Sequence, residues 1–472
     1  MTDDKVGMGG DKITDNAQKS GEGQEVERTS FATRLKEANP QTVGSSAHEK
    51  KPKVSQREGV SPSAVRFEFL EKFGSKPGLE RITKLLELWG NPQDKMKVVL
   101  VSGTNGKGSV TAFLSSILSA DGKKTGSYYS PHLLRFNERM KIDGVEISDS
   151  EVERLEGEVK EWADKGNVIT YFEAVTACAY RYFAEQGVDY AVMEVGMGGR
   201  LDAVNPAQEE IAIITSISLE HTKWLGSQVS QIAYEKAGIM KKGLAITGAG
   251  IGLETIKSEA RKKGVNLLVL GEDFEGNLRK RELGGSVFDY SNEMQLNGLE
   301  ISMLGDFQVR NASLAVCAAE SLGCSEKAIR AGLKKAKIEG RMEILGKEPF
   351  IVADVAHNSA GVKALVDSLG VFGEKRIVCV FSCMRDKKYG EMLKVLGEKV
   401  DAFVIVKPGG KERAEEPEVL LEKAKGYAEA YISAGIKDGI EFATEMAGPD
   451  GIVLITGSIY MMEEVYEALS EK

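Results

Sequence analysis

Short apolar runs alternate with amphipathic stretches along most of the chain. Apolar runs bounded by glycine or polar residues predict buried strands, and apolar residues that recur every three or four positions predict helices. In the first two thirds of the chain this pattern predicts strands at 98–101, at a run ending at 130, at 188–195 and at 211–217. It predicts helices at 64–73, 79–88, after the turn 103–109, and at 149–165, 171–186, 228–243, 310–322 and 325–337.

Two further patterns complete the prediction. Asp143-Gly144 between short runs is typical of a two-residue hairpin turn, and the alternation over 286–303 predicts two antiparallel strands around Asn297-Gly298. From about residue 350, predicted strands 350–354, 376–382, 402–406 and 451–456 alternate with helices such as 361–369 and 416–430. This alternation predicts a second, smaller parallel sheet.

Composition divides the chain into three segments. Residues 1–62 are rich in Gly, Ser, Lys, Glu and Gln and nearly lack branched apolar and aromatic residues, which predicts a disordered tail. We expect an α/β fold with a phosphate-loop (P-loop) domain over 63–343 and a smaller, Rossmann-like α/β domain over 344–472. The domains meet near 340–346 in this scheme, and we expect the active site in the cleft between them.

Charge and cysteine content narrow the function. The 472 residues carry a formal net charge of -9 without a basic stripe, which argues against nucleic-acid binding. No apolar run reaches the length of a membrane span and the N-terminus lacks a secretory apolar region, so we expect a cytoplasmic protein without a membrane partner. The five cysteines form no zinc-type pairs and suit small core positions in a reducing compartment.

The turn Gly103-Thr104-Asn105-Gly106-Lys107-Gly108-Ser109 joins the first predicted strand of this domain to a helix. Glycines allow backbone N–H groups to point inward, the helix adds its positive N-terminal end, and Lys107 can reach the β- and γ-phosphates of a nucleotide. Ser109 supplies the hydroxyl that such loops direct at Mg²⁺. The loop is a variant, because Val101 replaces the usual first glycine and Gly108 separates lysine from serine. The alternative is a glycine-rich turn without a ligand.

Polar residues follow several predicted strands. Glu194 ends the strand 188–195, Glu220-His221 follow the strand 211–217, and His132 and His357 follow two others. Ligands of open α/β sheets bind beyond the carboxyl ends of the strands, so these side chains are candidates for function. Glu194 suits Mg²⁺, since a buried carboxylate without a partner is costly. The alternative for each histidine is an ordinary structural residue.

With these residues assembled, the chain resembles the folylpolyglutamate synthase/dihydrofolate synthase family of the Mur ligase superfamily. The resemblance covers nearly everything after the tail, and this superfamily also places its loop hydroxyl two residues after the lysine. The motifs that carry it are KPGLERI (76–82), SGTNGKGS (102–109), SPHLLRFNERMKIDG (130–144), TYFEAVTACA (170–179), EVGMGGRLDAVN (194–205), EKAGIMK (235–241), LGDFQVRNASLA (304–315), GRMEI (340–344) and DVAHNSAG (354–361).

The resemblance implies a reaction and its cofactors. ATP phosphorylates a folate-type carboxylate, and the amino group of L-glutamate displaces phosphate from the acyl phosphate. Two anions must come together, which requires cations such as Lys107 and magnesium. By resemblance, Ser130, Glu194 and His221 hold Mg²⁺, and Lys236 is carboxylated and ligates a second Mg²⁺. The alternative for Lys236 is an ordinary surface lysine.

The resemblance also assigns the remaining site residues. It places Asn311, Arg341 and Asp354 on ATP beside loop residues 104–109, and His357 and Asn358 near the reacting carboxylate and the incoming glutamate. The implied catalytic set is Lys107, Lys236, Asp354 and His357. The implied pterin-binding residues are Tyr171, Phe172, Glu173, Arg200 and Asp202.

Departures from the family pattern leave alternatives open. Phe307, Ser359 and Glu220 replace the common histidine, proline and aspartate, although no phosphate or metal group is lost. We expect a monomeric ligase that acts on dihydropteroate, a reduced folate or both. The rival functions are a Mur-type ligase with another acceptor and a P-loop phosphotransferase or switch.

Overall fold

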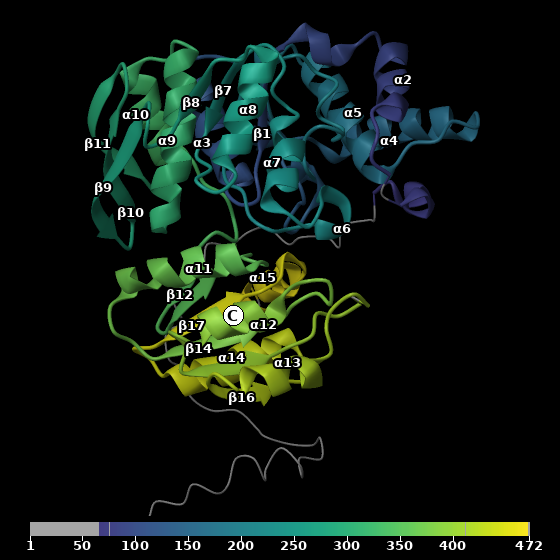
Figure 1. Cartoon of the computed structure of the whole chain (residues 1–472). Helices are drawn as coiled ribbons and strands as arrows, with labels where there is room; N and C mark the ends of the chain where they lie inside the picture. Colours follow the sequence, from purple (N-terminus) through teal and green to yellow (C-terminus); the bar gives the residue numbers. More distant parts are fainter. Residues whose placement is uncertain (1–65, 75, 411, 471–472) are drawn as a thin grey trace, which may run out of the picture. The chain divides into compact units, whose positions relative to one another are not determined.

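A computed structural model describes residues 66–74, 76–410 and 412–470 (Figure 1). The described residues belong to one compact unit, Lys53–Lys472. The predicted disordered tail lies outside the described residues. Among the residues described, no helix combines the length and the apolar character that a membrane crossing requires.

The first sheet has eight strands in the order β4-β3-β2-β5-β1-β6-β7-β8. β1 pairs in parallel with β5 on one side and β6 on the other, while β3 and β4 extend the sheet in antiparallel pairing. The predicted hairpin at Asp143-Gly144 is confirmed, and both turn residues have positive φ. The strands are β1 (Lys97–Ser102), β2 (Thr125–Tyr128), β3 (Met140–Ile142), β4 (Val145–Glu146), β5 (Tyr190–Glu194), β6 (Glu209–Ile214), β7 (Leu244–Thr247) and β8 (Leu267–Val269).

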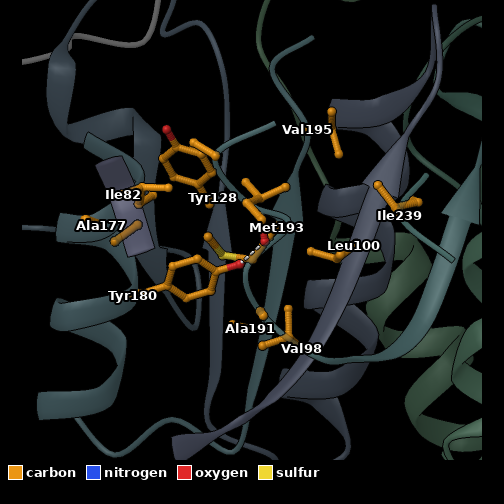
Figure 2. Close-up of a cluster of buried hydrophobic side chains, with 14 of the residues drawn as sticks. Ile82, Val98, Leu100, Tyr128, Ala177, Tyr180, Ala191, Met193, Val195 and Ile239 are labelled. Carbon is orange, nitrogen blue, oxygen red and sulfur yellow. Dashed lines mark hydrogen bonds between the residues drawn. The ribbon is translucent and has the colours of Figure 1, made fainter. Parts of the chain in front are cut away.

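Alternate residues of the central strands enter two separate cores. Val98 and Leu100 pack with α5 in one core, whereas Val99 and Val101 pack with α3 and α9 in the other. Figure 2 shows the first of these cores, where Ala177 and Tyr180 of α5 face the sheet. The helices of this region are α2 (Glu80–Leu88), α3 (Lys107–Ala120), α4 (Asp149–Asp164), α5 (Tyr171–Glu185), α6 (Thr222–Leu225), α7 (Val229–Ala237), α8 (Leu253–Lys263), α9 (Asp306–Ser321) and α10 (Glu326–Lys335), with 3₁₀ turns η1 (Glu68–Phe73), η2 (Pro92–Lys95) and η3 (Phe136–Arg139).

Two local predictions in this region are wrong. The described part of the predicted helix 64–73 is the 3₁₀ turn η1. The alternation over 286–303 gives two strands of a three-stranded antiparallel sheet, but they turn at residues 292–294, and Asn297-Gly298 lies inside a strand. Asn292 N donates to Met294 O to close that turn. The strands are β9 (Glu275–Glu282), β10 (Gly285–Ser291) and β11 (Gln295–Ile301).

The second large sheet has six strands in the order β12-β13-β17-β14-β15-β16. The predicted parallel strands are confirmed, but two edge strands were not predicted. β12 pairs antiparallel to β13, and β16 occupies the end of the predicted helix 416–430. The elements are β12 (Glu343–Lys347), β13 (Phe350–Ala353), β14 (Ile377–Phe381), β15 (Ala402–Ile405), β16 (Glu429–Ile432), β17 (Ile452–Thr456), α11 (Ser359–Ser368), η4 (Leu369–Phe372), α12 (Tyr389–Leu396), α13 (Pro417–Ala424), α14 (Ile436–Ala447), η5 (Ile459–Met461) and α15 (Met462–Ser470).

Apolar residues on both faces of this sheet are buried. Cys379 and Phe381 of β14 pack toward α11 and α12, and Val378 and Val380 pack toward α14. All five cysteines are free and buried, as predicted. The structure is therefore built from two α/β sheets covered on both faces, which confirms the predicted fold class.

Candidate active site

The loop 103–106 joins the carboxyl end of β1 to the first turn of α3. β1 is flanked by β5 and β6, so the strand that ends in Glu194 and the strand that leads to His221 lie on opposite sides of it. Ligand sites of open α/β sheets form where neighbouring strands lead away in opposite directions. The sheet order thus brings the predicted loop and both strand-end acids to one edge.

Residues after β6 hold the loop in shape. Thr215 Oγ1 donates to Asn105 O at 2.6 Å, and Ser216 Oγ accepts from Asn105 N at 3.0 Å. Gly103 has φ +147°, and a Cβ there would lie 1.9 Å from Thr215 Oγ1. Thr215 and Ser216 were not among the predicted site residues, although two small hydroxyl residues near the end of the predicted strand 211–217 were a usable signal.

Two lysines converge on the same loop. Lys107 Nζ donates to Gly103 O and Thr104 O at 3.2 Å each, and Lys236 Nζ donates to Gly103 O at 2.6 Å. Lys236 lies in α7 with its side chain buried, so the surface-lysine alternative is wrong. Burial and the nearby Lys107 cation lower the pKa of Lys236 to about 7. A substantial fraction of Lys236 is therefore a neutral amine near neutral pH.

Glu194 and Ser130 lie beside the loop at the ends of β5 and β2. Ser130 N donates to Glu194 Oε2 at 3.2 Å, and a Cβ on Gly108 would lie 3.5 Å from the same oxygen. Burial raises the pKa of Glu194, although Lys107 opposes that effect. The buried Ser130 Oγ has no hydrogen-bond partner among the described residues.

These oxygens are suited to a divalent cation. Within the described ranges, no three His, Cys, Asp or Glu side chains group as a metal site, but serine hydroxyls can also bind a cation. A carboxylate with one backbone donor and an unpaired hydroxyl are hard oxygen ligands of the kind that Mg²⁺ prefers. Ser109 is buried in the first turn of α3. The donor set thus fits the predicted cation.

One carboxylate oxygen of Glu220 lies close to a lysine and two histidines. His357 Nε2 lies 3.0 Å from Glu220 Oε1, and Lys387 Nζ and His221 Nε2 lie 3.7 Å and 3.8 Å from it. Burial opposes ionisation of Glu220, but the His357 hydrogen bond and nearby cations hold its pKa below the ordinary value. Burial lowers the pKa of His221, which favours a neutral imidazole able to bind metal.

The loop after β13 contacts the phosphate loop. Asn358 and Asn105 exchange two amide hydrogen bonds of 3.0 Å and 3.1 Å, and Asn358 also caps α11. Burial raises the pKa of Asp354, whose oxygens accept from Met342 N and Ala356 N. Arg341 precedes Met342 in the chain. Its positive charge lowers the pKa of Asp354 and so opposes the effect of burial, which indicates that the guanidinium lies near this carboxylate. The predicted residues of the second sheet therefore lie together at the carboxyl end of β13.

Asn311 of α9 packs on the turn that starts α3. Gly106 has φ +91°, and a Cβ there would lie 2.4 Å from Asn311 Oδ1. Asn311 Nδ2 donates to Gln308 Oε1 at 2.9 Å, which fixes the amide. Asn311 is thus adjacent to the phosphate loop, as the prediction for an ATP-binding residue requires.

The predicted pterin-binding residues have contacts within the fold. Tyr171 and Phe172 begin α5, and the Phe172 ring packs on Gly196. Asp202 accepts from Met197 N and Val204 N, and burial raises its pKa to about 6. Arg200 pairs with Glu235 at 2.8 Å, next to Lys236.

Glu173 has a clear structural role. Its carboxylate caps α5 by accepting from Thr170 N at 2.8 Å, and it forms a two-bond ion pair with Arg81. Glu173 is buried, so removal of its carboxylate leaves a guanidinium and a helix terminus without their partner.

We expect Glu173→Ala to lower the free energy of unfolding by about 2–4 kcal/mol. Urea unfolding followed by circular dichroism measures this loss. Glu153→Ala, on the exposed face of α4, is the control and should stay within roughly 0.5 kcal/mol of the wild type. Equal stability of Glu173→Ala and the wild type would contradict the structural role.

Two family descriptions match most of the residues that the structure describes. "Mur ligase middle domain" matches residues 101–319, and "Mur ligase, glutamate ligase domain" matches residues 340–459. The dihydrofolate synthase/folylpolyglutamate synthase of Bacillus subtilis is 34% identical over 415 residues, covering 84% of this chain and 96% of that protein. The Escherichia coli protein with the same description is 32% identical and covers 88% of this chain and 97% of its own.

Solved structures agree with these similarities. E. coli FolC in complex with DHPP and ADP has a TM-score of 0.79 at 31% identity and covers 85% of this chain and 96% of that one. A bifunctional folylpolyglutamate synthase/dihydrofolate synthase with Mn, AMPPNP and L-glutamate bound has a TM-score of 0.76 at 31% identity, with 85% and 96% covered. The similarity therefore extends over both sheets.

Proposed function

The chain belongs to the folylpolyglutamate synthase/dihydrofolate synthase family of the Mur ligases, and on that premise we propose that it ligates L-glutamate to a folate-type carboxylate with ATP. The observation that carries the proposal is the convergence of Lys107, Lys236 and Glu194 on one phosphate loop. His357 and Asn358 lie in the loop after β13 of the second sheet. His357 contacts Glu220, and Asn358 contacts Asn105 of the phosphate loop.

The chemistry proceeds in two steps. A carboxylate oxygen of the acceptor forms a bond to the γ-phosphorus of ATP while the bond to ADP breaks. The amino nitrogen of glutamate then attacks the acyl carbon, loses a proton and expels phosphate, which leaves an amide. ATP hydrolysis is thereby coupled to amide formation, because the phosphate converts a poor leaving group into a good one.

Each residue has a role in this scheme. Lys107 neutralises the β- and γ-phosphates, and the backbone of 104–109 surrounds them. Asn311 and Asp354 contact the nucleoside, Arg341 offsets charge on the γ-phosphate, and His357 and Asn358 orient the incoming glutamate. Tyr171, Phe172, Arg200 and Asp202 line the pterin side, with Glu173 holding the start of α5.

Ser130, Glu194 and His221 would hold the first magnesium ion, with Ser109 directed at it from the loop. When bound, the metal neutralises phosphate charge. The buried Ser130 hydroxyl without a partner supports this assignment. A related structure holds Mn with a nucleotide, so a divalent metal accompanies the nucleotide in at least one relative.

Lys236 is proposed to carry a carboxyl group that helps to hold a second magnesium ion. A neutral amine can attack CO₂, forming an N–C bond and releasing one proton to give a carbamate anion. Burial and a pKa of about 7 make the neutral amine available. The modification would turn one of two adjacent cations into an anion.

We also propose that the enzyme acts as a monomer in the cytoplasm. All proposed site residues come from one chain, and five free thiols together with ATP as substrate suit a reducing compartment.

An acceptor panel tests the proposed function. Purified protein with ATP, Mg²⁺ and L-glutamate should release phosphate only when dihydropteroate or tetrahydrofolate is present, and mass spectrometry should show a product that has gained one glutamyl unit. Phosphate release without either acceptor would favour a phosphotransferase or switch. An adduct formed only with a different acceptor would favour another Mur-type ligase.

A further inference from the structure

Arg139 is a buried arginine at the end of the 3₁₀ turn η3. Only 6% of the residue is exposed, and it is the single arginine in the described part of the chain that is buried to this degree. It lies in the segment 130–139, which connects Ser130 to β3 and to which the proposed function gives no further role. Tyr129 N donates to Arg139 O at 2.9 Å, which fixes its backbone beside Ser130.

The guanidinium of Arg139 is held without an acidic partner. Its Nε donates to His132 Nδ1 at 2.8 Å, and its central carbon lies 5.7 Å from the Tyr171 ring centre and 6.0 Å from that of Phe136. Among the residues that the structure describes, Arg139 forms no ion pair with Asp or Glu. These neighbours are an imidazole nitrogen and two aromatic rings, so within the described ranges the other guanidinium nitrogens have no carboxylate partner.

A buried guanidinium is costly unless an anion compensates it. Within the described part of the chain, no hydrogen bond or ion pair joins Arg139 to Glu194, whose Oε2 accepts from Ser130 N. Arginine is the side chain whose planar fork binds a carboxylate through two parallel hydrogen bonds, and a ligand can provide that carboxylate.

The position of Arg139 indicates which ligand. Its backbone is bonded to Tyr129, the neighbour of the proposed metal residue Ser130, and its guanidinium lies near the ring of Tyr171, a proposed pterin residue. The acceptor must place its carboxylate next to the metal and its ring system next to the aromatic residues. Arg139 is therefore close both to a proposed metal residue and to a proposed pterin residue.

We propose that Arg139 binds the acceptor's reacting carboxylate and orients it toward the γ-phosphate, an inference that rests on the proposed function. The two hydrogen bonds hold the carboxylate in place and offset its charge as it approaches ATP. His132 and the two rings keep the fork in position. Arg139 would therefore determine that the acceptor is an acid.

A ligand pair and a variant pair test this assignment. The ligands are dihydropteroate, whose one carboxylate is the reacting group, and its carboxamide, each bound in the presence of a non-hydrolysable ATP analogue. We expect the wild type to bind the acid about 10–100-fold more tightly than the amide. In Arg139→Gln that ratio should fall to about one, and Arg139→Lys should give an intermediate ratio.

Arg135→Gln is the matched control, because Arg135 lies four residues earlier in the same segment and its side chain is 42% exposed. It should keep the wild-type ratio, and all variants should keep the wild-type affinity for the ATP analogue. If Arg139→Gln does not fold, the ratio in Arg139→Lys decides, since a merely structural arginine would leave that ratio unchanged.

A folded Arg139 variant that keeps the wild-type preference in affinity for the acid over the amide would overturn the inference while leaving the proposed function intact. A wild type that binds neither of these ligands nor tetrahydrofolate would instead contradict the proposed function, and the inference would fall with it. If only tetrahydrofolate binds, the ratio is measured with that folate and its carboxamide. A wild type that binds both equally would overturn the inference alone.

Discussion

Lys236→Ala is expected to lower the rate of ligation by about three orders of magnitude while leaving ATP binding within about threefold of the wild type. The reason is that we expect Lys107 and the loop backbone to hold the phosphates, whereas Lys236 contacts the loop through Gly103 O. The variant would lose the proposed carbamate and keep the residues proposed to bind phosphate. Steady-state turnover and equilibrium titration with an ATP analogue measure the two effects separately.

Carboxylation adds a pH signature to this prediction. The pKa of Lys236 is lowered to about 7, so the amine is mainly protonated below pH 7 and mainly neutral above it. Only the neutral amine attacks CO₂, and activity at limiting CO₂ should therefore rise with pH through about 7. Labelling with ¹³CO₂ should give a carbamate resonance in the wild type that is absent from the variant.

Lys242→Ala serves as the control, because Lys242 is exposed and lies six residues after Lys236. It should keep the wild-type rate and the carbamate resonance. Added formate or acetate should restore part of the activity of Lys236→Ala, since a small carboxylate can replace the missing anion. A Lys236→Ala variant with the wild-type rate would rule out the carboxylated-lysine assignment.

Local patterns predicted the elements that carry the chemistry. β1, the loop and α3 follow from an apolar run, a glycine-rich turn and helical spacing, and these signals are contained in about 25 consecutive residues. Glu194 was placed correctly at the end of a strand because all five residues of β5 are buried. Such features depend on patterns of apolar and polar residues within a short stretch of sequence.

Tertiary contacts decide the features that the sequence did not predict. Asn297-Gly298 has the composition of a hairpin turn, but Gly298 N donates to Asp289 and the strand continues through it. β16 pairs with β15 at the sheet edge, so its partner overrides the helical pattern of 416–430. The unpaired guanidinium of Arg139 is likewise visible only once its neighbours from other elements are known.

Glu194→Gln is expected to reduce ligation by about three orders of magnitude without destabilising the fold. The amide keeps the size of the side chain and still accepts from Ser130 N, but it removes the anion that would bind the metal. The wild-type carboxylate is buried with a raised pKa, so its ionisation opposes folding at neutral pH. Glu194→Gln should therefore lower the activity, while the stability either rises or stays the same.

The sign of the pH effect follows from the raised pKa. The folded protein holds the Glu194 proton more tightly than the unfolded chain does, so this contribution to stability is complete below the ordinary pKa of 4.5. It is lost as pH rises through the raised pKa of the folded state. Thermal unfolding of Glu194→Gln should consequently depend less on pH than that of the wild type above about pH 4.5.

Glu209→Gln provides the matched comparison for this prediction. Glu209 is also a buried glutamate of the same sheet, but its Oε1 accepts from Lys241 N at 2.6 Å, Lys242 N at 2.8 Å and Gly243 N at 3.2 Å. Glu209→Gln replaces an acceptor shared by three backbone donors, so it should lower stability and leave turnover within about threefold. A Glu194→Gln variant that lost stability as Glu209→Gln does, or that kept its activity, would show that the Glu194 carboxylate is structural.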